Sequence, residues 1–554
     1  MTVHLKQDEP DTSNRLDGMK QGVIGQPISR VEGLAKVTGT APYAAEYPIE
    51  GCVEGVLATA TITRGEILKI DKDSVLGMPG VIAVIDDPRL TTRAAQGTAN
   101  EAPQQSPRTV CYWGQPIALV VAETFEQARD AAKHLAVEYR PDDGAPLSPD
   151  AVQPEEQEDE TVRQGDLVHA MSEAAHSVDV TFTTKGHASA AMEPHAAIAQ
   201  WDGDQLTVHA SLQMLNYNIS ELADAIDLPE EKVRLVSRFV GGGFGSKLGV
   251  SEETVAAAIA AMQLERPVRV VMSRQQVFQC IMRRSETTQR LRLAADQKGR
   301  LTGFGHEALV SNLPGETFAE PVLQSSHFLY AAQNRKLMLE VARIHRMTAG
   351  SVRAPGEAVG MPALEGAMDV LAERAGIDPV ELRLRNIPKE NPEEGLPFSS
   401  HKLAECLREG AEAFGWDSGP RKPRQKREGE WWVGTGMASA ARVHNVGEAK
   451  ARVTLKPDGT ALVETDMTDI GTGTYTILAQ IAGEMLGLDP ENVLVDLGDT
   501  RHPRGPGSGG SWGASSSGSA VYVACKALRE ELADRVGVTE TELDLADGKV
   551  VGGQ

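Results

Sequence analysis

Residues 240–247, VGGGFGSK, combine four glycines with an aromatic residue and a Ser-Lys pair. Glycine lets the backbone approach a ligand closely, and successive N–H groups in a loop can bind an anion. Two familiar phosphate loops do not fit: Leu248 stands where a P-loop has Ser or Thr, and Ser246 stands where a dinucleotide-binding fingerprint has its third glycine. By itself the loop is equally compatible with a tight turn and with a ligand-binding loop.

Four further segments contain glycines or short polar residues but lie far apart in the chain. They are 209–214 (HASLQM), 351–360 (SVRAPGEAVG), 468–476 (TDIGTGTYT) and 504–519 (RGPGSGGSWGASSSGS). Ser and Thr hydroxyls add short hydrogen-bond donors to the backbone N–H groups. Together with the first loop, these segments predict a long ligand with several negative charges, lying across domain junctions.

The elements that position these loops predict a mixed α/β chain. Residues 117–121 are typical of a strand, and Thr124 with Gln127 forms a capping box that begins a helix. The alternation in 232–240 predicts a strand before the glycine loop, and 251–262 predicts a helix capped by Ser251 after it.

Two further elements follow from local signals later in the chain. An apolar stripe over 364–375 predicts a buried helix that ends at Gly376. Residues 451–467 predict two strands around an Asp458-Gly459 turn.

The length of 554 residues predicts three or four domains. An acidic stretch at 153–164 and a basic one at 418–430 are interpreted as solvated linkers, the latter in preference to a nucleic-acid patch because it lacks interleaved aromatic residues. We therefore expect a flexible N-terminal arm and three structural segments. Their bounds are 1–24 for the arm, then 25–150, 165–417 and 430–554.

The composition excludes several classes of protein. A net charge of -23 argues against a nucleic-acid partner, and no run approaches the length of a membrane span. The N-terminus lacks the order of a signal peptide. The five cysteines are scattered and contain no CxxC, which predicts buried, reduced side chains and no metal held by thiolates.

With these motifs in place, the chain resembles the molybdopterin-binding large subunit of the xanthine dehydrogenase/aldehyde oxidase family. Within that family it most resembles the bacterial molybdenum-binding aldehyde oxidoreductase subunit. The likeness covers nearly the whole chain from residue 25 onward. The motifs that carry it, in the family's order, are AMEPHA, GGGFG, RAPGEA, ALEGAMDVLAERAGIDPVELRLRN and TDIGTGTYT.

The resemblance implies an α+β (mixed α/β) chain with an α/β-hammerhead domain followed by two molybdopterin-binding domains. It implies a pyranopterin cofactor, in the cytosine dinucleotide form, whose dithiolene sulfurs hold the molybdenum in place of protein side chains. It also implies that [2Fe–2S] clusters and FAD, on partner subunits, receive the electrons.

The resemblance also assigns cofactor contacts by position. Gln213 would hydrogen-bond the apical oxo group, the backbone around Phe244 would lie beside the metal, and Arg353 would contribute through its backbone. Two later loops would contact the pterin and the diphosphate, although Thr472 replaces the glutamine that many relatives have there. The remaining predicted cofactor contacts are Gly242, Gly243, Gly245, Gly471, Gly473, Ser508, Gly509, Gly510, Ser511, Ser515 and nearby Ser517.

The family's reaction is oxidative hydroxylation, and departures from its pattern indicate the substrate. Purine-oxidising relatives have a glutamate where this chain has Leu248 and a phenylalanine where it has Pro355. A pocket lacking those groups favours a lipophilic or aromatic aldehyde over a purine. Arg442 matches an active-site arginine of similar aldehyde oxidoreductases and would stabilise oxyanion charge, the alternative being a surface arginine on a strand. His195 is interpreted as a structural histidine.

The general base of the family, a glutamate in a GxGE-type motif, does not occur in the sequence given. Glu448, in HNVGEA, lies in the wrong domain and is not assigned to that role. The last residues, 542–554, predict a hairpin that stops in its second strand, so we expect a continuation in the same or a separate chain. The resemblance leaves the compartment as cytoplasmic, or periplasmic through export with a partner.

Three other functions remain as alternatives at this stage. The first is a catalytically incompetent cofactor-binding or assembly subunit, since loss of a general base costs about 10²–10⁴-fold in rate. The second is an N-heterocycle hydroxylase similar to xanthine dehydrogenase. A nicotinamide-dependent enzyme is the least favoured.

Overall fold

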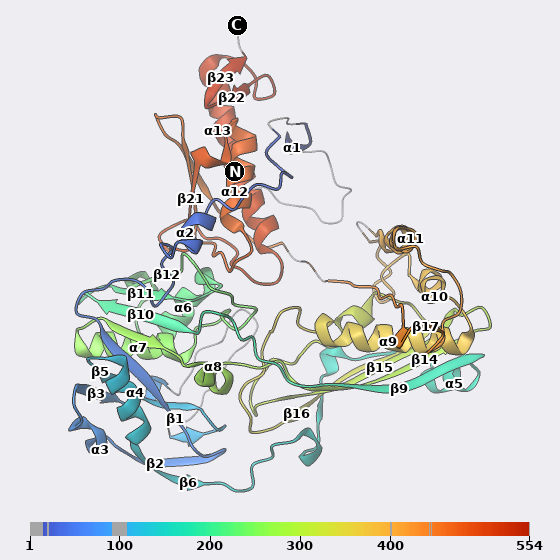
Figure 1. Ribbon diagram of the computed structural model, residues 1–554, viewed down its shortest axis with the longest axis horizontal. Helices are drawn as coiled ribbons and strands as arrows, with labels where there is room; N and C mark the ends of the chain where they lie inside the picture. Colours follow the sequence, from blue (N-terminus) through green and yellow to red (C-terminus); the bar gives the residue numbers. More distant parts are fainter. Residues whose placement is uncertain are drawn as a thin grey trace.

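The structure is a computed structural model that describes residues 15–18, 22–90, 108–398, 401–442, 444 and 446–552. Residues 1–14 and 19–21 of the predicted N-terminal arm lie outside the described residues. Three bodies are visible in Figure 1: a blue-to-green body built on one sheet, a teal-to-yellow body built on a second sheet, and an orange-to-red body above both. The chain is a mixed α/β protein, as the sequence predicts.

The first body is organised by a seven-stranded mixed sheet in the order β12-β11-β10-β13-β1-β5-β3. Its strands are β1 (Val53–Thr59), β3 (Val81–Ile85), β5 (Pro116–Ala122), β10 (Ala196–Trp201), β11 (Leu206–Ala210), β12 (Val233–Val236) and β13 (Val268–Val271). Every residue of β5 is buried, and helix α7 (Glu252–Leu264) packs on β10 and β13. Strands from both predicted segments, 25–150 and 165–417, thus share one hydrophobic core.

The predicted capping box begins helix α4 (Phe125–His134), with both hydrogen bonds between Thr124 and Gln127 present. A small sheet of β4 (Thr109–Val110), β2 (Gly65–Asp71) and β6 (Ala136–Pro141) lies nearby. The cap expected for α7 is wrong in detail. Ser251 occupies the N-cap position, but its hydroxyl donates to Glu253 Oε2 at 2.7 Å instead of accepting from the helix backbone.

The second body is a six-stranded sheet whose main path is β7-β16-β15-β14-β9. The long strands are β9 (His176–Thr184), β14 (Thr287–Ala295), β15 (Leu301–Asn312) and β16 (Asn334–Arg343). Helix α9 (Glu357–Ala375) packs on β9 and β14 and ends at Gly376, as predicted. Helices α5 (Leu167–Ser172), α8 (Arg274–Cys280), α10 (Pro379–Asn386) and α11 (Leu403–Phe414) complete this region.

The acidic stretch 153–164 is not a linker, which corrects the sequence-based interpretation. It contains two short strands, β7 (Glu155–Glu156) and β8 (Val162–Gln164), and both pair antiparallel with β16. Arg343 Nε donates to Glu155 Oε2 at 3.1 Å. The acidic side chains therefore lie on a sheet edge where basic partners from β16 are in reach.

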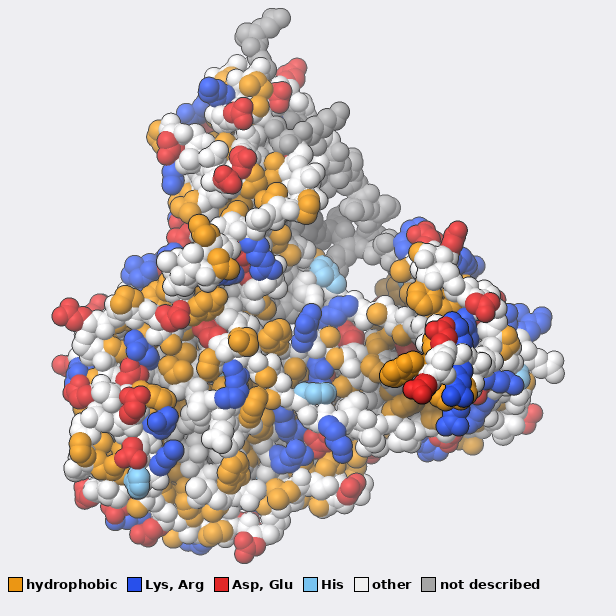
Figure 2. Space-filling model, viewed as in Figure 1, with side chains coloured by type: hydrophobic (Ala, Val, Ile, Leu, Met, Phe, Trp, Pro, Cys, Tyr) orange, Lys and Arg blue, Asp and Glu red, His pale blue; other side chains and the backbone are white. Residues whose placement is uncertain are grey.

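The basic stretch 418–430 is also more ordered than a linker. It ends in a hairpin of β17 (Lys426–Glu428) and β18 (Trp431–Val433), and the Arg421 guanidinium lies 4.2 Å from the Trp416 ring centroid. Trp431 and Trp432 are exposed. Basic, acidic and apolar side chains are interspersed over α11 and this hairpin in Figure 2.

The third body packs helices α12 (Thr474–Leu486) and α13 (Gly513–Val536) against the sheet β19-β20-β21. Its strands are β19 (Arg452–Leu455), β20 (Ala461–Thr465) and β21 (Val493–Leu497), and β19 and β20 flank the predicted Asp458-Gly459 turn. The predicted terminal hairpin is present as β22 (Asp544–Ala546) and β23 (Lys549–Gly552).

The N-terminal segment lies against the third body, beside helix α12 (Figure 1). The N–H groups of Val23 and Ile24 donate to Glu484 Oε2 at 2.8 and 3.2 Å, and the Val31 N–H donates to Thr476 Oγ1 at 3.1 Å. This placement differs from the expectation that residue 25 begins the first structural segment. The segment instead connects the first body to the third.

Two of the five cysteines, Cys280 and Cys525, are buried as expected. Cys52 and Cys111 are half-buried and Cys406 is exposed, which corrects the prediction for these three; all five are free thiols. No helix in the described part of the chain is long and apolar enough to cross a membrane.

Candidate functional site

The glycine loop follows β12 and is shaped by its neighbours. A Cβ on Gly243 would lie 2.2 Å from Gln213 Oε1, and one on Gly245 would lie 1.8 Å from the Ser351 carbonyl oxygen. Phe244, between them, has φ +56°, a left-handed conformation that is rare for an aromatic residue. Glycines are thus required at both flanks for packing, independent of any ligand.

Some N–H groups of this loop are hydrogen-bonded within the described part of the protein, and others are not. Gly245 N–H donates to Gln213 Oε1 at 3.1 Å, and Ser246 N–H donates to the Gly243 carbonyl at 3.1 Å. Among the described residues, the N–H groups of Gly242, Gly243 and Phe244 have no acceptor. Gly245 is therefore less available to a ligand than predicted, whereas Gly243 and Phe244 retain free donors.

Gln213 joins two of the predicted loops. Its side chain, only 2% exposed, accepts from Gly245 N–H and Lys247 N–H and donates through Nε2 to the Ser508 carbonyl at 2.5 Å. Its backbone carbonyl accepts from Ser508 N–H at 2.8 Å and from Thr468 Oγ1 at 2.9 Å. A primary amide has two N–H bonds, so one Nε2 hydrogen remains for a ligand.

The RAPGEA loop contacts the glycine loop directly. Arg353 N–H donates to the Phe244 carbonyl at 2.8 Å, and Ala354 has φ +54°. Arg284 Nη2 donates to the carbonyl oxygens of Val352 and Arg353, which fixes the loop from behind. The Arg353 side chain is exposed, and it is the backbone of Arg353 that contacts the glycine loop; its predicted contribution to the cofactor stays a prediction.

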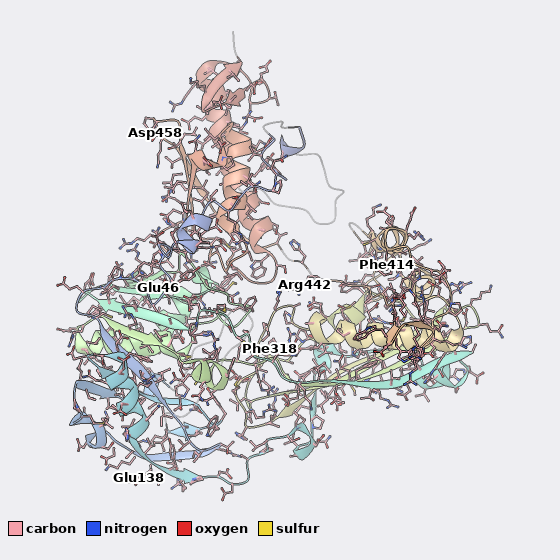
Figure 3. The ribbon with its side chains drawn as sticks, viewed as in Figure 1. Glu46, Glu138, Phe318, Phe414, Arg442 and Asp458 are labelled. Atoms are coloured by element: carbon pink, nitrogen blue, oxygen red, sulfur yellow. The ribbon has the colours of Figure 1, made fainter. Side chains whose placement is uncertain are left out.

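Arg442 lies between the second and third bodies (Figure 3). Its Nη1 donates to Glu357 Oε1 at 2.8 Å, and its Nε lies 3.4 Å from Ser511 Oγ. It is in no strand, and two-thirds of its side chain is covered. Arg442 thus bridges the first residue of α9 and Ser511, while a third of its side chain stays exposed.

In the TDIGTGTYT loop, two of the predicted donors are already used. Asp469 Oδ1 accepts from Gly471 N–H at 2.6 Å and from Thr472 N–H at 3.0 Å. Arg30, from the N-terminal segment, donates through Nη1 to the Gly471 carbonyl at 2.9 Å. Gly473 is the N-cap residue of α12. The N–H groups of Gly471 and Thr472, two of the predicted cofactor contacts, are therefore already hydrogen-bonded within the protein.

The serine-rich loop, residues 504–519, runs into the start of α13 and lies against the glycine loop. Ser508 donates through Oγ to the Thr468 carbonyl at 2.5 Å, and a Cβ on Gly509 would lie 2.8 Å from Leu248 Cδ2. Gly510 and Ser511 both have positive φ, with Ser511 at +60°. The left-handed non-glycine residues Phe244, Ala354 and Ser511 thus lie in three of the loops that meet here, as strained residues at functional sites often do.

Two buried donors of the 504–519 segment lack acceptors in the described structure, one just before α13 and one near the start of that helix. Trp512 Nε1 and Ser517 Oγ are inaccessible to solvent, and neither has a hydrogen-bond partner among the described residues. Ser515 Oγ, by contrast, has partners in the Trp512 carbonyl at 3.0 Å and His444 Nε2 at 3.3 Å. Buried polar groups are usually satisfied, and other unsatisfied buried atoms occur elsewhere in the described chain, so these two donors are compatible with a ligand that carries acceptor atoms.

Lys247 and His195 have structural roles. Lys247 is fully buried and pairs with Glu193 Oε2 at 2.8 Å, so it does not face an external anion. His195 Nε2 lies 2.8 Å from the Ser246 carbonyl, and burial together with the Lys247 charge lowers its pKa to about 3. The side chain of Glu448 is 87% exposed, in agreement with leaving it unassigned.

Several residues of this site were missed by the sequence analysis. Glu193 and Glu357 lie inside the quoted motifs AMEPHA and RAPGEA, but nothing in the sequence indicated their partners. Glu320 is fully buried, accepts from Gly356 N–H at 2.7 Å, and has a pKa raised to about 7 by burial. Arg284 and Trp512 had no local signal.

A cavity of about 980 Å³ lies elsewhere, between the first and second bodies. Residues that line it include Trp113, Lys185, Phe278, Arg283, Glu286 and Arg346. It contains none of the predicted site residues, and Leu248 and Pro355 are half-buried outside it. Across the described ranges, no group of three or more His, Cys, Asp or Glu side chains could hold a metal ion.

Comparison with known families matches three regions of the chain. Residues 38–143 match the aldehyde oxidase and xanthine dehydrogenase a/b hammerhead domain. Residues 151–387 and 409–553 match molybdopterin cofactor-binding domains.

Individual relatives agree with these matches. The chain is 44% identical to the aldehyde oxidoreductase molybdenum-binding subunit PaoC of Escherichia coli O157:H7, over 99% of this chain and 75% of that protein. It is 27% identical to the xanthine dehydrogenase molybdenum-binding subunit of the same organism, over 94% of this chain and 74% of that protein.

Among solved structures, quinoline 2-oxidoreductase from Pseudomonas putida 86 matches with a TM-score of 0.83 at 22% identity, over 96% of this chain and 74% of that one. Aldehyde oxidoreductase from Desulfovibrio gigas matches with a TM-score of 0.77 at 23% identity, over 97% of this chain and 65% of that one. At these identities the two structures support the fold alone.

Proposed function

Because this chain belongs to the aldehyde oxidase and xanthine dehydrogenase family of molybdopterin-binding proteins, we propose that it is the molybdenum-binding subunit of an aldehyde oxidoreductase. Its substrates would be aromatic or lipophilic aldehydes, oxidised to carboxylic acids with water as the oxygen source. Its nearest functional alternative, hydroxylation of N-heterocycles, is disfavoured by the apolar Leu248 and Pro355.

The residues present fit a molybdopterin. The orphan donors Trp512 Nε1 and Ser517 Oγ need acceptor atoms, and the free N–H groups of Gly243 and Phe244 need a polar group beside them. Gln213 retains one amide hydrogen. These groups would hold the cofactor, for which we propose the cytosine dinucleotide form. When bound, the cofactor supplies the oxidative hydroxylation chemistry and takes up the two electrons removed from the substrate.

Arg442 would bind the carbonyl oxygen of the aldehyde. Its guanidinium is held by Glu357 and lies near Ser511, so its orientation is set before substrate arrives. A preorganised cationic donor in a partly covered site stabilises the negative charge that develops on that oxygen. We therefore assign Arg442 the role of oxyanion stabiliser.

Leu248 and Pro355 would shape the apolar side of the substrate site. Leu248 is half-buried and follows the glycine loop, while Pro355 precedes the Gly356–Glu357 turn into α9. Neither side chain offers a hydrogen bond to the polar edge of a purine, and a buried polar edge without partners is costly. An aldehyde with an apolar body places only its carbonyl oxygen among donors.

Partner subunits would carry the electrons onward. The cysteines are dispersed over separate elements, and no metal-binding cluster occurs in the portion of the chain that the structure describes. We propose that [2Fe–2S] clusters and FAD on other subunits accept the electrons. The relative PaoC is itself named as a subunit of an aldehyde oxidoreductase.

The observation that carries the proposal is the Gln213 amide, which joins the glycine loop to Ser508 and so assembles the separated motifs into one site. The test is metal and pterin analysis of the purified complex, with oxidation of benzaldehyde and of hypoxanthine measured with an artificial electron acceptor. Molybdenum with faster benzaldehyde oxidation is expected. Absence of molybdenum would overturn the proposal, and preference for hypoxanthine would overturn its aldehyde part.

A further inference from the structure

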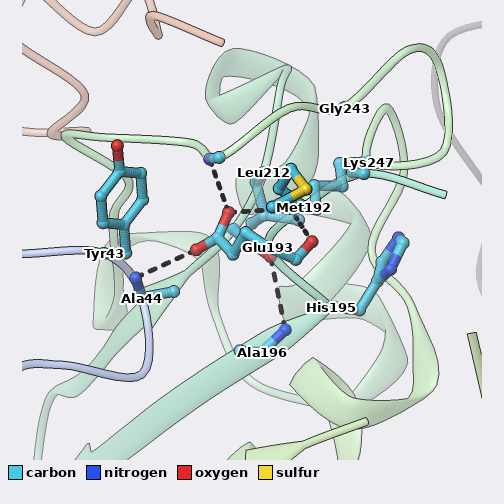
Figure 4. A network of polar contacts seen from close by, with 12 residues as sticks. Tyr43, Ala44, Met192, Glu193, His195, Ala196, Leu212, Gly243 and Lys247 are labelled. Carbon is cyan, nitrogen blue, oxygen red and sulfur yellow. Dashed lines mark hydrogen bonds and ion pairs between the residues drawn. The ribbon is translucent and has the colours of Figure 1, made fainter. Parts of the chain in front are cut away.

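A buried ion pair lies behind the glycine loop (Figure 4). Lys247 Nζ is 2.8 Å from Glu193 Oε2; the lysine side chain is fully buried and that of Glu193 is 11% exposed. Burial lowers the pKa of Lys247, while the neighbouring Glu193 carboxylate opposes that effect. A charge so deeply buried is stable only with a close partner, so the two side chains depend on each other.

Glu193 contacts both ends of the glycine loop. Its Oε2 accepts from Gly241 N–H at 2.8 Å in addition to Lys247, and its own N–H donates to the Gly241 carbonyl at 3.1 Å. Lys247 Nζ also donates to the Glu193 carbonyl at 3.1 Å. Residues 241 and 247, the two ends of the loop, are therefore tied to one residue of a different segment.

The same carboxylate reaches the N-terminal segment. Glu193 Oε1 accepts from Ala44 N–H at 3.3 Å, as seen beside Tyr43 in Figure 4. The turn that carries Glu193 is itself held, since Arg274 Nη2 donates to the carbonyls of Ala191 and Met192 at 2.5 and 3.2 Å. Glu193 is thus held in place by contacts outside the glycine loop, and it can therefore fix the position of that loop.

The charged and titratable groups that face the ion pair are His195, Glu253 and Arg274. His195, next to it, remains neutral because burial and the Lys247 charge lower its pKa to about 3. Glu253, fully buried on α7, bonds Ser251 and Thr254, and burial raises its pKa.

On its other face, the loop is held by Gln213 and by the RAPGEA loop, which contacts Phe244. Between these two sets of contacts lie the free N–H groups of Gly243 and Phe244. A run of glycines has many conformations in solution, so such a tip needs anchors on both sides to present its donors in one direction.

We propose that Glu193 and Lys247 are positioning residues, whose ion pair sets the N–H groups of Gly243 and Phe244 toward the cofactor site. Lys247 would thus stabilise the conformation of the glycine loop and would not bind an anionic ligand. What those N–H groups contact rests on the proposed function; the positioning itself does not.

The test compares Glu193→Gln, Lys247→Met and Lys247→Arg with wild type in the intact complex. A matched control is Glu307→Gln, because Glu307 is also largely buried (15% exposed) and also has two cationic partners, Arg292 and Lys336. Hydrogen exchange over 240–248, molybdenum and pterin content, the Mo(V) EPR signal, and kcat and KM per bound molybdenum are measured.

We expect Glu193→Gln and Lys247→Met to speed exchange at the hydrogen-bonded N–H groups of the loop, those of Gly241, Gly245 and Ser246, by about tenfold or more, since only one anchored face remains. The Mo(V) signal should change, and kcat should fall by about 10–100-fold with KM within about threefold, as for a small misplacement at a reacting centre. Lys247→Arg should recover part of kcat, because it restores a cation beside Glu193. Glu307→Gln should leave all these quantities at wild-type values.

Wild-type loop exchange, EPR signal and kcat in Glu193→Gln would overturn the inference. That variant keeps the volume of the side chain and an acceptor oxygen, so it decides the matter even if Lys247→Met does not fold. A wild-type complex without molybdenum would instead contradict the proposed function, while the exchange measurement would still test the positioning.

Discussion

Arg442 and Glu357 form an ion pair with Nη1 and Oε1 2.8 Å apart. Glu357 is the first residue of α9, and Arg442 comes from the segment that precedes the third body. Arg442 also reaches Ser511 in the serine-rich loop. The pair therefore connects the RAPGEA loop to the loop that carries the orphan donors, at the point where the substrate carbonyl is proposed to bind.

Removal of either partner should reduce catalysis by different amounts. Arg442→Met should lower kcat/KM for benzaldehyde by about 10²–10³-fold, the usual effect of losing one oxyanion donor. Glu357→Gln keeps the guanidinium but weakens its orientation, so we expect about a tenfold loss. Steady-state kinetics per bound molybdenum measures both. Arg452→Met, which removes an exposed partner of Glu464, is the control and should retain wild-type kinetics.

Glu320 should make the stability of the protein depend on pH. Burial raises its pKa from 4.5 to about 7 in the folded protein, so the folded state holds a proton that the unfolded state releases. The stabilisation is complete below about pH 4.5 and is lost as the pH rises through about 7. The two pKa values correspond to about 3 kcal/mol.

Glu320→Gln should accordingly flatten this dependence. The variant's apparent Tm relative to wild type should rise between pH 5 and pH 8, as measured by thermal unfolding in a series of buffers. Asp466, whose pKa burial also raises to about 7, remains in the variant, so part of the slope persists. Glu373→Gln, on the exposed side of α9, should leave the slope unchanged. An identical slope in Glu320→Gln would contradict the prediction.

Local signals predicted local structure correctly. Thr124 and Gln127 form their capping box, and Gly376 ends α9 in the left-handed conformation, because both features depend on residues within one helical turn. The acidic stretch 153–164 was misassigned because its strands form only against β16, nearly two hundred residues later. Charge content alone does not reveal such a pairing.

The candidate site shows the same contrast between signals within one short segment and contacts between distant segments. The sequence indicated which loops could bring their backbone close to a ligand, but it did not predict that Phe244 and Ser511 are left-handed. It did not indicate that the Asp469 carboxylate accepts hydrogen bonds from the N–H groups of Gly471 and Thr472. A loop with the same sequence could equally have directed these N–H groups to solvent. Pairings across long separations, such as Arg442 with Glu357, become visible only in the folded chain.

The identity of residue 248 should affect substrate choice. Leu248→Glu places a carboxylate where a half-buried apolar side chain now lies against Gly509. We expect kcat/KM for an aromatic aldehyde to fall by at least about tenfold, because an apolar substrate that covers the carboxylate removes water from a charge that has no partner. Parallel assays with benzaldehyde and hypoxanthine measure the ratio. Leu248→Met, which keeps volume and apolar character, should stay within about threefold of wild type.

The orphan indole of Trp512 should matter for cofactor retention. Its Nε1 is buried and has no acceptor among the described residues, whereas a bound cofactor would supply one. Trp512→Phe removes the N–H and keeps an aromatic ring. Loss of one buried hydrogen bond costs about 1–2 kcal/mol, which corresponds to about 5–30-fold weaker retention.

Pterin and molybdenum content after dialysis measures that retention directly. Trp431→Phe is the matched control, because Trp431 is 78% exposed on the β17–β18 hairpin and should leave the content unchanged. Ser517→Ala should act in the same direction as Trp512→Phe, since Ser517 Oγ is the second orphan donor of the loop. Full retention in both variants would place these donors outside the cofactor site, and equal losses in Trp431→Phe would trace the effect to stability instead.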